Sequence, residues 1–262
     1  MGSGTRQLSA YLQHLRHAGN RHSVHSPFVF GLVEQALRKQ SGAPKFPDIE
    51  TLRKSLLNNG RSIPVEDHGA GSHRHHGAER RIKDIARSAL KPRPQAELLH
   101  RIVRWAKPEN MLELGTSLGL TTVYLARGNA SGRVTTIEGA PAIHALAKQH
   151  FALLGQGNIT ALCGSFKEHL PAALASMDRL DLAFIDGHHA QEPTLAYFGQ
   201  CLSKAHNDTV FVLDDIHWSA GMEAAWRAMQ EHPRVTVTVD LFKFGLVFLR
   251  KEQQREHFRL RY

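Results

Sequence analysis

The feature that most constrains the fold of this chain is a regular alternation of strand-like and helix-like segments between about residues 111 and 250. Short apolar runs alternate with longer segments whose apolar residues recur at helical spacing. This alternation predicts a parallel sheet that is covered by helices on both faces. The predicted strands are 110–115, 133–139, 158–164, 180–187, 209–215, 234–241 and 244–250, and the helices are 118–128, 141–154, 166–176, 192–205 and 219–231.

The end of this pattern breaks the alternation. Only Phe242 and Lys243 link the last two predicted strands. So short a link cannot form a parallel crossover, which needs a dozen or more residues. We therefore predict an α/β fold with a seven-stranded sheet, flanked by helices, in which the last strand is antiparallel.

The N-terminal part of the chain has a different pattern. Apolar residues recur at helical spacing in "RQLSAYLQHLRH", "SPFVFGLVEQALRKQ" and "ELLHRIVRWA". We predict an α-helical N-terminal extension over residues 1–94, with a Gly- and His-rich loop at about 58–79, and a sheet domain over 95–262. A loop of that length in a compact protein is usually functional or disordered.

Composition and charge indicate which kinds of protein and which binding partners this chain is compatible with. Hydrophobic residues make up 42% of the 262 residues, and no run of about 18 apolar residues is present, so no membrane span is expected. The N-terminus lacks a secretory signal pattern, and we expect a cytoplasmic protein. Cys163 and Cys201 match no metal or redox spacing. The net charge of +9 favours anionic partners, RNA among them, although the basic residues are spread and no RNA-binding motif is present.

Acidic residues stand at the ends of four of the first five predicted strands. They are Glu113, Glu138, Asp186 and the pair Asp214 and Asp215. Capping of the following helix explains one or two such residues but explains four poorly. Because ligands of open parallel sheets bind at the carboxyl ends of the strands, these acids form the candidate site.

A glycine turn follows the first of these strands. Gly115 and Gly119 flank it in "ELGTSLG", where backbone could approach a ligand at the start of a helix. The spacing E-x-G-x-x-x-G differs from the dinucleotide fingerprint G-x-G-x-x-G and lacks the Lys-Ser/Thr of a phosphate loop. Glu138 is placed to accept hydrogen bonds from the two hydroxyls of a ribose.

Taken together, "LELGTSLG", "TTIEG", "CGSF", "LAFIDGHH" and "VLDDIHW" resemble the class I S-adenosylmethionine-dependent methyltransferases, which have a Rossmann-like sheet. The resemblance covers about residues 95–250 and is strongest to the branch of catechol-like and caffeoyl-coenzyme-A-like O-methyltransferases. The whole chain also resembles bacterial methyltransferases with a helical N-terminal extension, a similarity that implies no particular substrate.

The resemblance implies a cofactor, S-adenosyl-L-methionine, and a set of residues that bind it. Glu113 would lie near the ammonium group, Glu138 would bind the ribose, and Ser165 and Phe166 would lie near the adenine. The full set of implied cofactor-binding residues is Glu113, Gly115, Thr116, Ser117, Gly119, Glu138, Gly139, Ser165, Phe166 and Asp186.

In the metal-dependent branch of this family, an Asp and an Asp-Asn pair bind a divalent cation. The matching residues here are Asp186, Asp214 and Asp215, which suit Mg²⁺ or another divalent metal. The family's lysine is replaced by histidine in "DGHH". The predicted catalytic residues are Asp186, His188, His189, Asp214 and His217. One of the histidines would act as a general base or as an additional metal ligand.

The loop "DHGAGSHRHH" leaves three interpretations open: surface filler, a metal-binding tract, or a lid with hinges at Gly69 and Gly71. As a lid, it would bring histidines or arginines to an anionic acceptor; these are His73, Arg74, His75, His76 and Arg80.

The predicted function is methyl transfer to a hydroxyl of a small molecule. The alternatives are RNA methylation, an NAD-type dinucleotide-binding protein and a binding protein without catalysis. The sequence names no acceptor, and the N-terminal helices could form a homodimer contact as readily as a lid.

Overall fold

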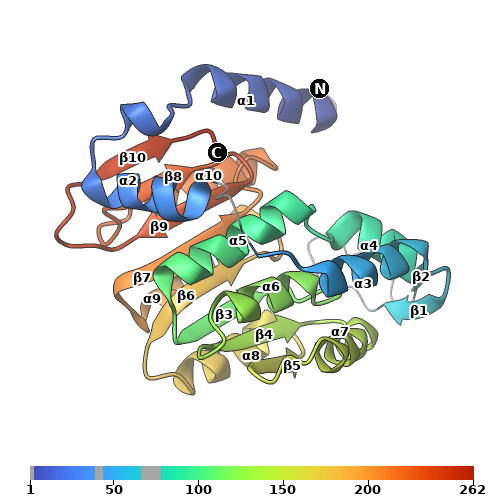
Figure 1. Cartoon of the computed structure of the whole chain (residues 1–262). Coiled ribbons are helices and arrows are strands. Elements are labelled where there is room, and N and C mark those ends of the chain that lie inside the picture. The colour runs from blue at the N-terminus through green and yellow to red at the C-terminus, as the bar shows by residue number, and fades with distance from the viewer. Residues whose placement is uncertain (1–2, 39–43, 66–77) are drawn as a thin grey trace. The chain divides into compact units, whose positions relative to one another are not determined.

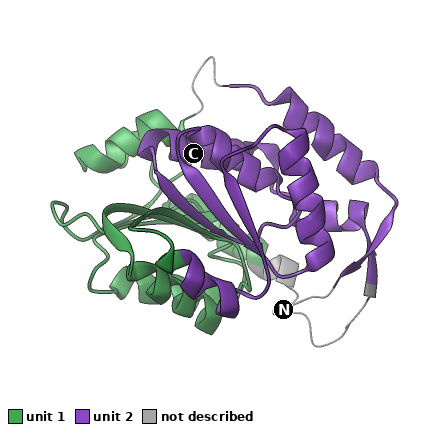
Figure 2. Ribbon diagram, turned by 90° about the horizontal axis from the view of Figure 1, so that it is seen from below, with its two compact units in different colours: residues 1–38, 174–262 green, residues 39–173 purple. Residues whose placement is uncertain are grey.

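The computed structural model describes residues 3–38, 44–65 and 78–262. These residues form two compact units, which are coloured separately in Figure 2. One unit combines residues 1–38 with 174–262, and the other spans 39–173. The predicted division at residue 94 stays a prediction; the two units are divided near residues 38 and 173.

The unit of residues 39–173 contains a parallel sheet with helices packed against it (Figure 1). Its strand order is β3-β4-β5, with all neighbours parallel. Buried apolar side chains of α3, α4, α6 and α7 form the core of this unit; Leu120, Val123 and Phe151 are among them. Its elements are α3 (Pro47–Asn58), β1 (Ser62–Val65), β2 (Ala78–Arg81), α4 (Ile82–Ala89), α5 (Arg93–Ala106), β3 (Asn110–Leu114), α6 (Leu120–Gly128), β4 (Arg133–Glu138), α7 (Pro141–Leu153), β5 (Ile159–Cys163) and most of α8 (Phe166–Ala175).

The other unit contains strands in the order β10-β8-β9-β7-β6. β6 is parallel to β7, β9 is antiparallel to β7 and β8, and β10 is parallel to β8. α9 packs on β6 and β7, and α10 packs on α9 and β9. Its elements are α1 (Ser3–His17), a 3₁₀ turn (Arg21–Ser23), α2 (Pro27–Leu32), a π turn (Val33–Leu37), β6 (Leu180–Ile185), α9 (Gln191–Leu202), β7 (Ala205–Asp214), α10 (Ala220–Glu231), β8 (Val237–Asp240), β9 (Phe244–Phe248) and β10 (Glu256–Arg259).

Local sequence explains where several helices begin. Pro47 and Pro141 occupy the first turns of α3 and α7, where a missing N–H costs nothing. The side chains of Ser26 and Ser219 accept hydrogen bonds from backbone N–H groups three residues later and so cap α2 and α10.

The α/β fold class is confirmed, and each of the seven predicted strands is present as β3 to β9. The hairpin of β8 and β9 is antiparallel, as the short link required. The prediction of seven strands was nevertheless one short, because β10 adds an edge strand beside β8. In β10 only Phe258 is buried, so its sequence carries little apolar signal.

The predicted loop at 58–79 was partly wrong. Ser62–Val65 and Ala78–Arg81 pair as an antiparallel hairpin, in which Ile63 and Val65 are buried. In β1 the two buried residues alternate with others over only four positions, and a pattern this short does not predict a strand from the sequence. The His-rich segment itself lies in 66–77, outside the described residues, so its three interpretations stay predictions.

Among the helices of the described residues, none combines the length and the apolar character that crossing a membrane would require.

Candidate functional site

Glu113 is fully buried at the end of β3. Its Oε2 accepts hydrogen bonds from the hydroxyls of Thr122 at 2.5 Å and Thr136 at 2.7 Å, whereas its Oε1 is buried without a hydrogen-bond partner. Burial raises the pKa of Glu113 to about 7, although the two threonine hydroxyls act to lower it. Neither threonine was predicted as a partner of Glu113 from the sequence. Thr136 pairs with Glu113 in the register of β3 and β4, a relation that only the sheet reveals.

The glycine turn after β3 uses backbone conformations that side chains disfavour. Gly115, Ser117 and Gly119 have φ values of 103°, 47° and 81°. A Cβ on Gly119 would lie 2.6 Å from Cε1 of Phe151, so a larger residue there would have to displace the ring as well as adopt a positive φ. The hydroxyls of Thr116 and Thr136 share a hydrogen bond of 2.5 Å. The turn therefore has a defined shape directly before α6.

Glu138 connects this turn to the next helix. Its Oε2 accepts a hydrogen bond from the N–H of Ser117 at 2.8 Å, and its Oε1 accepts one from the N–H of Ala140 at 2.9 Å. Burial raises the pKa of Glu138, against these backbone hydrogen bonds. Each carboxylate oxygen has a second lone pair, so Glu138 can hold the turn and still accept hydroxyl groups of a ligand. Gly139, which follows it, is half-buried.

Ser165 and Glu168 form a capping box at the start of α8. The hydroxyl of Ser165 accepts from the N–H of Glu168 at 3.3 Å, and a carboxylate oxygen of Glu168 accepts from the N–H of Ser165 at 3.3 Å. Ser165 therefore has a structural role beside its predicted role near an adenine. Phe166, the first residue of the helix, is half-buried.

Three of the predicted catalytic residues lie together at the carboxyl ends of β6 and β7. Asp186, His189 and Asp214 each offer a ligand atom within 4.8 Å of the others. Nε2 of His189 lies 3.6 Å from Oδ1 of Asp186. His188 and His189 have φ values of 63° and 31°, and strained backbone of this kind tends to occur at functional sites. His188 contacts the hydroxyl of Tyr197 at 2.9 Å through Nδ1, a partner that the sequence did not suggest.

Asp215 and His217 have other partners. Asp215 is not a member of this cluster and pairs with Nζ of Lys243 at 3.1 Å. Nε2 of His217 lies 3.0 Å from Oδ2 of Asp240, and its ring stacks on Phe242. The cluster thus contains His189 where the sequence analysis expected Asp215. A role of Asp215 as a metal ligand and of His217 as a catalytic base stays a prediction.

The predicted site residues fall in both units. Those from Glu113 to Phe166 belong to residues 39–173, and those from Asp186 to His217 belong to the other unit. Each unit by itself presents acidic groups at the carboxyl ends of parallel strands, where ligands of α/β proteins bind.

A family model described as a methyltransferase domain matches residues 112–216. This segment of the chain is therefore similar to methyltransferase domains. The segment includes every predicted site residue except His217, and the match confirms the recognition of the class I S-adenosylmethionine-dependent methyltransferases from the sequence.

Individual relatives are similar to parts of this chain. A protein of Mycobacterium sp. (strain JLS) named "Putative O-methyltransferase" is 32% identical over 124 residues, which are 47% of this chain and 56% of the relative. The chain thus spans little more than half the length of that relative. A Mycobacterium tuberculosis protein named "Catechol O-methyltransferase" is 28% identical over 158 residues, 55% of this chain and 70% of the relative.

Among solved structures, an O-methyltransferase from Bacillus cereus in complex with SAH aligns with a TM-score of 0.56 and 18% identity. The alignment covers 84% of this chain and 95% of that one. At this identity the likeness shows a shared fold, and the expected Rossmann-like fold is thereby confirmed.

Proposed function

We propose that this protein is an S-adenosylmethionine-dependent methyltransferase that methylates a hydroxyl group of a small molecule. The observation that carries the proposal is the position of Glu138. Within the matched methyltransferase domain, this carboxylate holds the glycine turn in place through the N–H of Ser117 and keeps free acceptor capacity.

The residues of the turn and of the neighbouring strand fit the chemistry of this cofactor. S-adenosylmethionine carries an ammonium and a sulfonium cation, a carboxylate and a ribose with two hydroxyls. Glu138 would accept the ribose hydroxyls, and the N-terminus of α6 after Gly119 would bind the carboxylate. Ser165 and Phe166 would border the adenine. The Bacillus cereus protein of the same fold was solved with SAH.

Acceptor chemistry would fall to Asp186, His189 and Asp214. In the proposed step, the acceptor oxygen attacks the methyl carbon, the S–CH₃ bond breaks as the O–CH₃ bond forms, and the acceptor proton passes to His189. S-adenosylhomocysteine and a methyl ether result. Asp186, 3.6 Å from His189, would stabilise the imidazolium that forms. Two carboxylates and one imidazole also suit a divalent metal, which would lower the pKa of the acceptor hydroxyl when bound.

Calorimetry with S-adenosylmethionine, S-adenosylhomocysteine and NAD tests the cofactor. We expect binding of the first two and none of the third. Glu138→Gln should weaken binding of S-adenosylhomocysteine at least about tenfold, because hydrogen bonds to a charged acceptor contribute about 1.5–3 kcal/mol. Glu97→Gln, which alters an ion pair with Arg93 on α5, is the matched control and should leave binding unchanged. Absence of S-adenosylmethionine binding would refute the proposal.

Asp214→Asn tests whether a divalent metal assists methyl transfer. If a divalent ion assists the reaction, EDTA should lower methyl transfer by wild type and Asp214→Asn should lower the response to added Mg²⁺ or Mn²⁺. Equal activity in all of these conditions would limit the cluster to acid–base chemistry. RNA methylation is supported by the net charge alone, so we propose no second function.

A further inference from the structure

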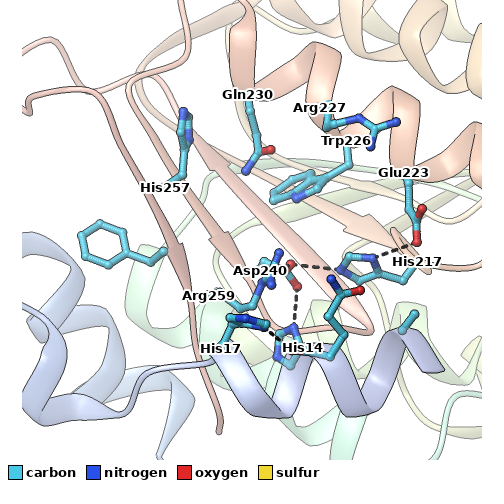
Figure 3. A pocket seen from close by; sticks show the side chains of 13 residues that line it. His14, His17, His217, Glu223, Trp226, Arg227, Gln230, Asp240, His257 and Arg259 are labelled. Atoms are coloured by element: carbon cyan, nitrogen blue, oxygen red, sulfur yellow. Dashed lines mark hydrogen bonds and ion pairs between the residues drawn. The ribbon is translucent and has the colours of Figure 1, made fainter. Parts of the chain in front are cut away.

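A second group of metal-ligating side chains lies in the unit of residues 1–38 and 174–262, separate from the acidic cluster at Asp186. It consists of His14 on α1, His217 in the loop after β7 and Asp240 at the end of β8. Figure 3 shows the three side chains pointing toward one another at the wall of a cavity of about 440 Å³. The methyltransferase proposal does not require any contact within this group.

The distances between the ligand atoms suit a shared cation. Nδ1 of His14 lies 3.3 Å from Oδ1 of Asp240, and Nε2 of His217 lies 3.0 Å from Oδ2 of Asp240. Two ligands that each lie about 2.0–2.2 Å from a zinc-like ion are separated by about 3–3.5 Å at tetrahedral or octahedral angles. All three ligand atoms lie within 4.8 Å of one another, so small side-chain movements could bring them to one ion.

The side chain of His14 points to a missing positive charge. His14 is 4% exposed, and both of its ring nitrogens face acceptors: Nε2 lies 3.3 Å from the carbonyl oxygen of Leu260 and Nδ1 lies 3.3 Å from Oδ1 of Asp240. A neutral ring has a single N–H, so whichever nitrogen carries the hydrogen, the other one faces an acceptor with its lone pair. Two acceptors that face each other at this distance repel unless a proton or a metal cation lies between them.

Both histidines also have the outer partners that metal ligands require. A histidine that binds a metal through one nitrogen usually donates its other N–H to a carbonyl or carboxylate, which fixes the tautomer. His14 has the Leu260 carbonyl in this position. Nδ1 of His217 lies 3.5 Å from Oε1 of Glu223, the corresponding carboxylate for the second ring. Figure 3 shows this pair beside the contacts to Asp240.

We propose that His14, His217 and Asp240 bind a divalent transition metal of the zinc class and thereby tie α1 to the end of β8. Two imidazoles and one carboxylate select such metals over Mg²⁺ or Ca²⁺. The remaining coordination positions would face the cavity. Nε of Arg259 lies 3.4 Å from Oδ2 of Asp240, but its side chain is 40% exposed and can turn toward solvent when a cation binds.

Cobalt(II) is the probe for this site, because its visible absorption reports its ligands. The double variant Asp186→Asn and Asp214→Asn serves as background, since it removes the other cluster. We expect this background to bind one Co²⁺ per chain, displaced by Zn²⁺. Adding His14→Gln or His217→Gln should weaken Co²⁺ at least about 100-fold, since losing an outer-shell partner alone costs 10–100-fold. Glu223→Gln should weaken it about tenfold.

The matched control is His17→Gln, which changes another histidine of α1 that lines the same cavity but lies outside the cluster. It should bind Co²⁺ like the background. Circular dichroism of each variant confirms folding, and His217→Gln provides a second test if His14→Gln does not fold. No Co²⁺ binding in the background, or equal binding in the His14, His17 and His217 variants, would overturn the proposal and leave only a buried His–Asp–His network.

Discussion

At the scale of single residues, Glu113 couples strand β3 to α6 and β4 through its two threonine partners. Its pKa of about 7, compared with the ordinary 4.5, gives a testable pH dependence. Between these values the unfolded chain loses the proton of Glu113 while the folded protein keeps it. The free energy of unfolding therefore falls by up to about 3 kcal/mol as pH rises from 4.5 to 7. Above pH 7 this contribution no longer changes with pH.

Urea unfolding of wild type and Glu113→Gln between pH 4.5 and 8 measures this effect. The free energy of unfolding of wild type, minus that of the variant, should decrease as pH rises through this range, because only wild type carries the titrating group. A difference that stays constant with pH, or increases, would show that Glu113 is ionised in the folded protein.

Gly119 gives a prediction about backbone and packing together. Gly119→Ala should destabilise the protein through its positive φ and through contact with the ring of Phe151. Gly155→Ala is a matched control, because Gly155 has φ of 65° and open space around its Cβ position. We expect Gly155→Ala to cost about 1–2 kcal/mol and Gly119→Ala about 1–3 kcal/mol more. Equal losses in thermal unfolding would contradict a steric role for Phe151.

At the scale of elements, the capping box of α8 separates two roles of Ser165. Ser165→Ala should lower the free energy of unfolding by about 1 kcal/mol, because the N–H of Glu168 loses its side-chain acceptor. Ser165→Asp keeps a capping oxygen and should retain that stability. Calorimetry of the same variants tests the proposed adenine contact: if both variants bind S-adenosylhomocysteine like wild type, Ser165 acts only as a cap.

The strands also differ in how well their local sequences predict them. β6 is buried along its whole length and is apolar except for Asp181, a pattern that is typical of a central parallel strand. β10, β1 and β2 have four residues each; β10 has one buried side chain and β1 has two, whereas Glu79, Arg80 and Arg81 of β2 are exposed. These short strands depend on their neighbours, so local pattern did not predict them.

At the scale of the whole molecule, binding of the cofactor should stabilise the folded chain. A ligand at about 100 times its Kd adds about 2.7 kcal/mol to the free energy of unfolding. For a chain of this size we expect the melting temperature to rise by roughly 5–10 °C. S-adenosylhomocysteine should produce this rise, and NAD should not. A rise with NAD alone would favour the dinucleotide-binding alternative over the methyltransferase.

The sequence by itself determined the alternation of strands and helices, the reversed direction of β9 and the acids at the strand ends. These features follow from local periodicity and link length, which are written in consecutive residues. The joint set of strand-end motifs was specific enough to identify the methyltransferase family, which the domain match at 112–216 confirms.

Only the tertiary structure decided which side chains meet. Thr122 and Thr136 reach Glu113 from a helix and a neighbouring strand, His189 joins Asp186 and Asp214 in place of Asp215, and His14 reaches Asp240 across 226 positions of sequence. Such contacts depend on strand register and helix packing. Sequence spacing does not encode them, because residues far apart in the chain become neighbours only when the elements pack.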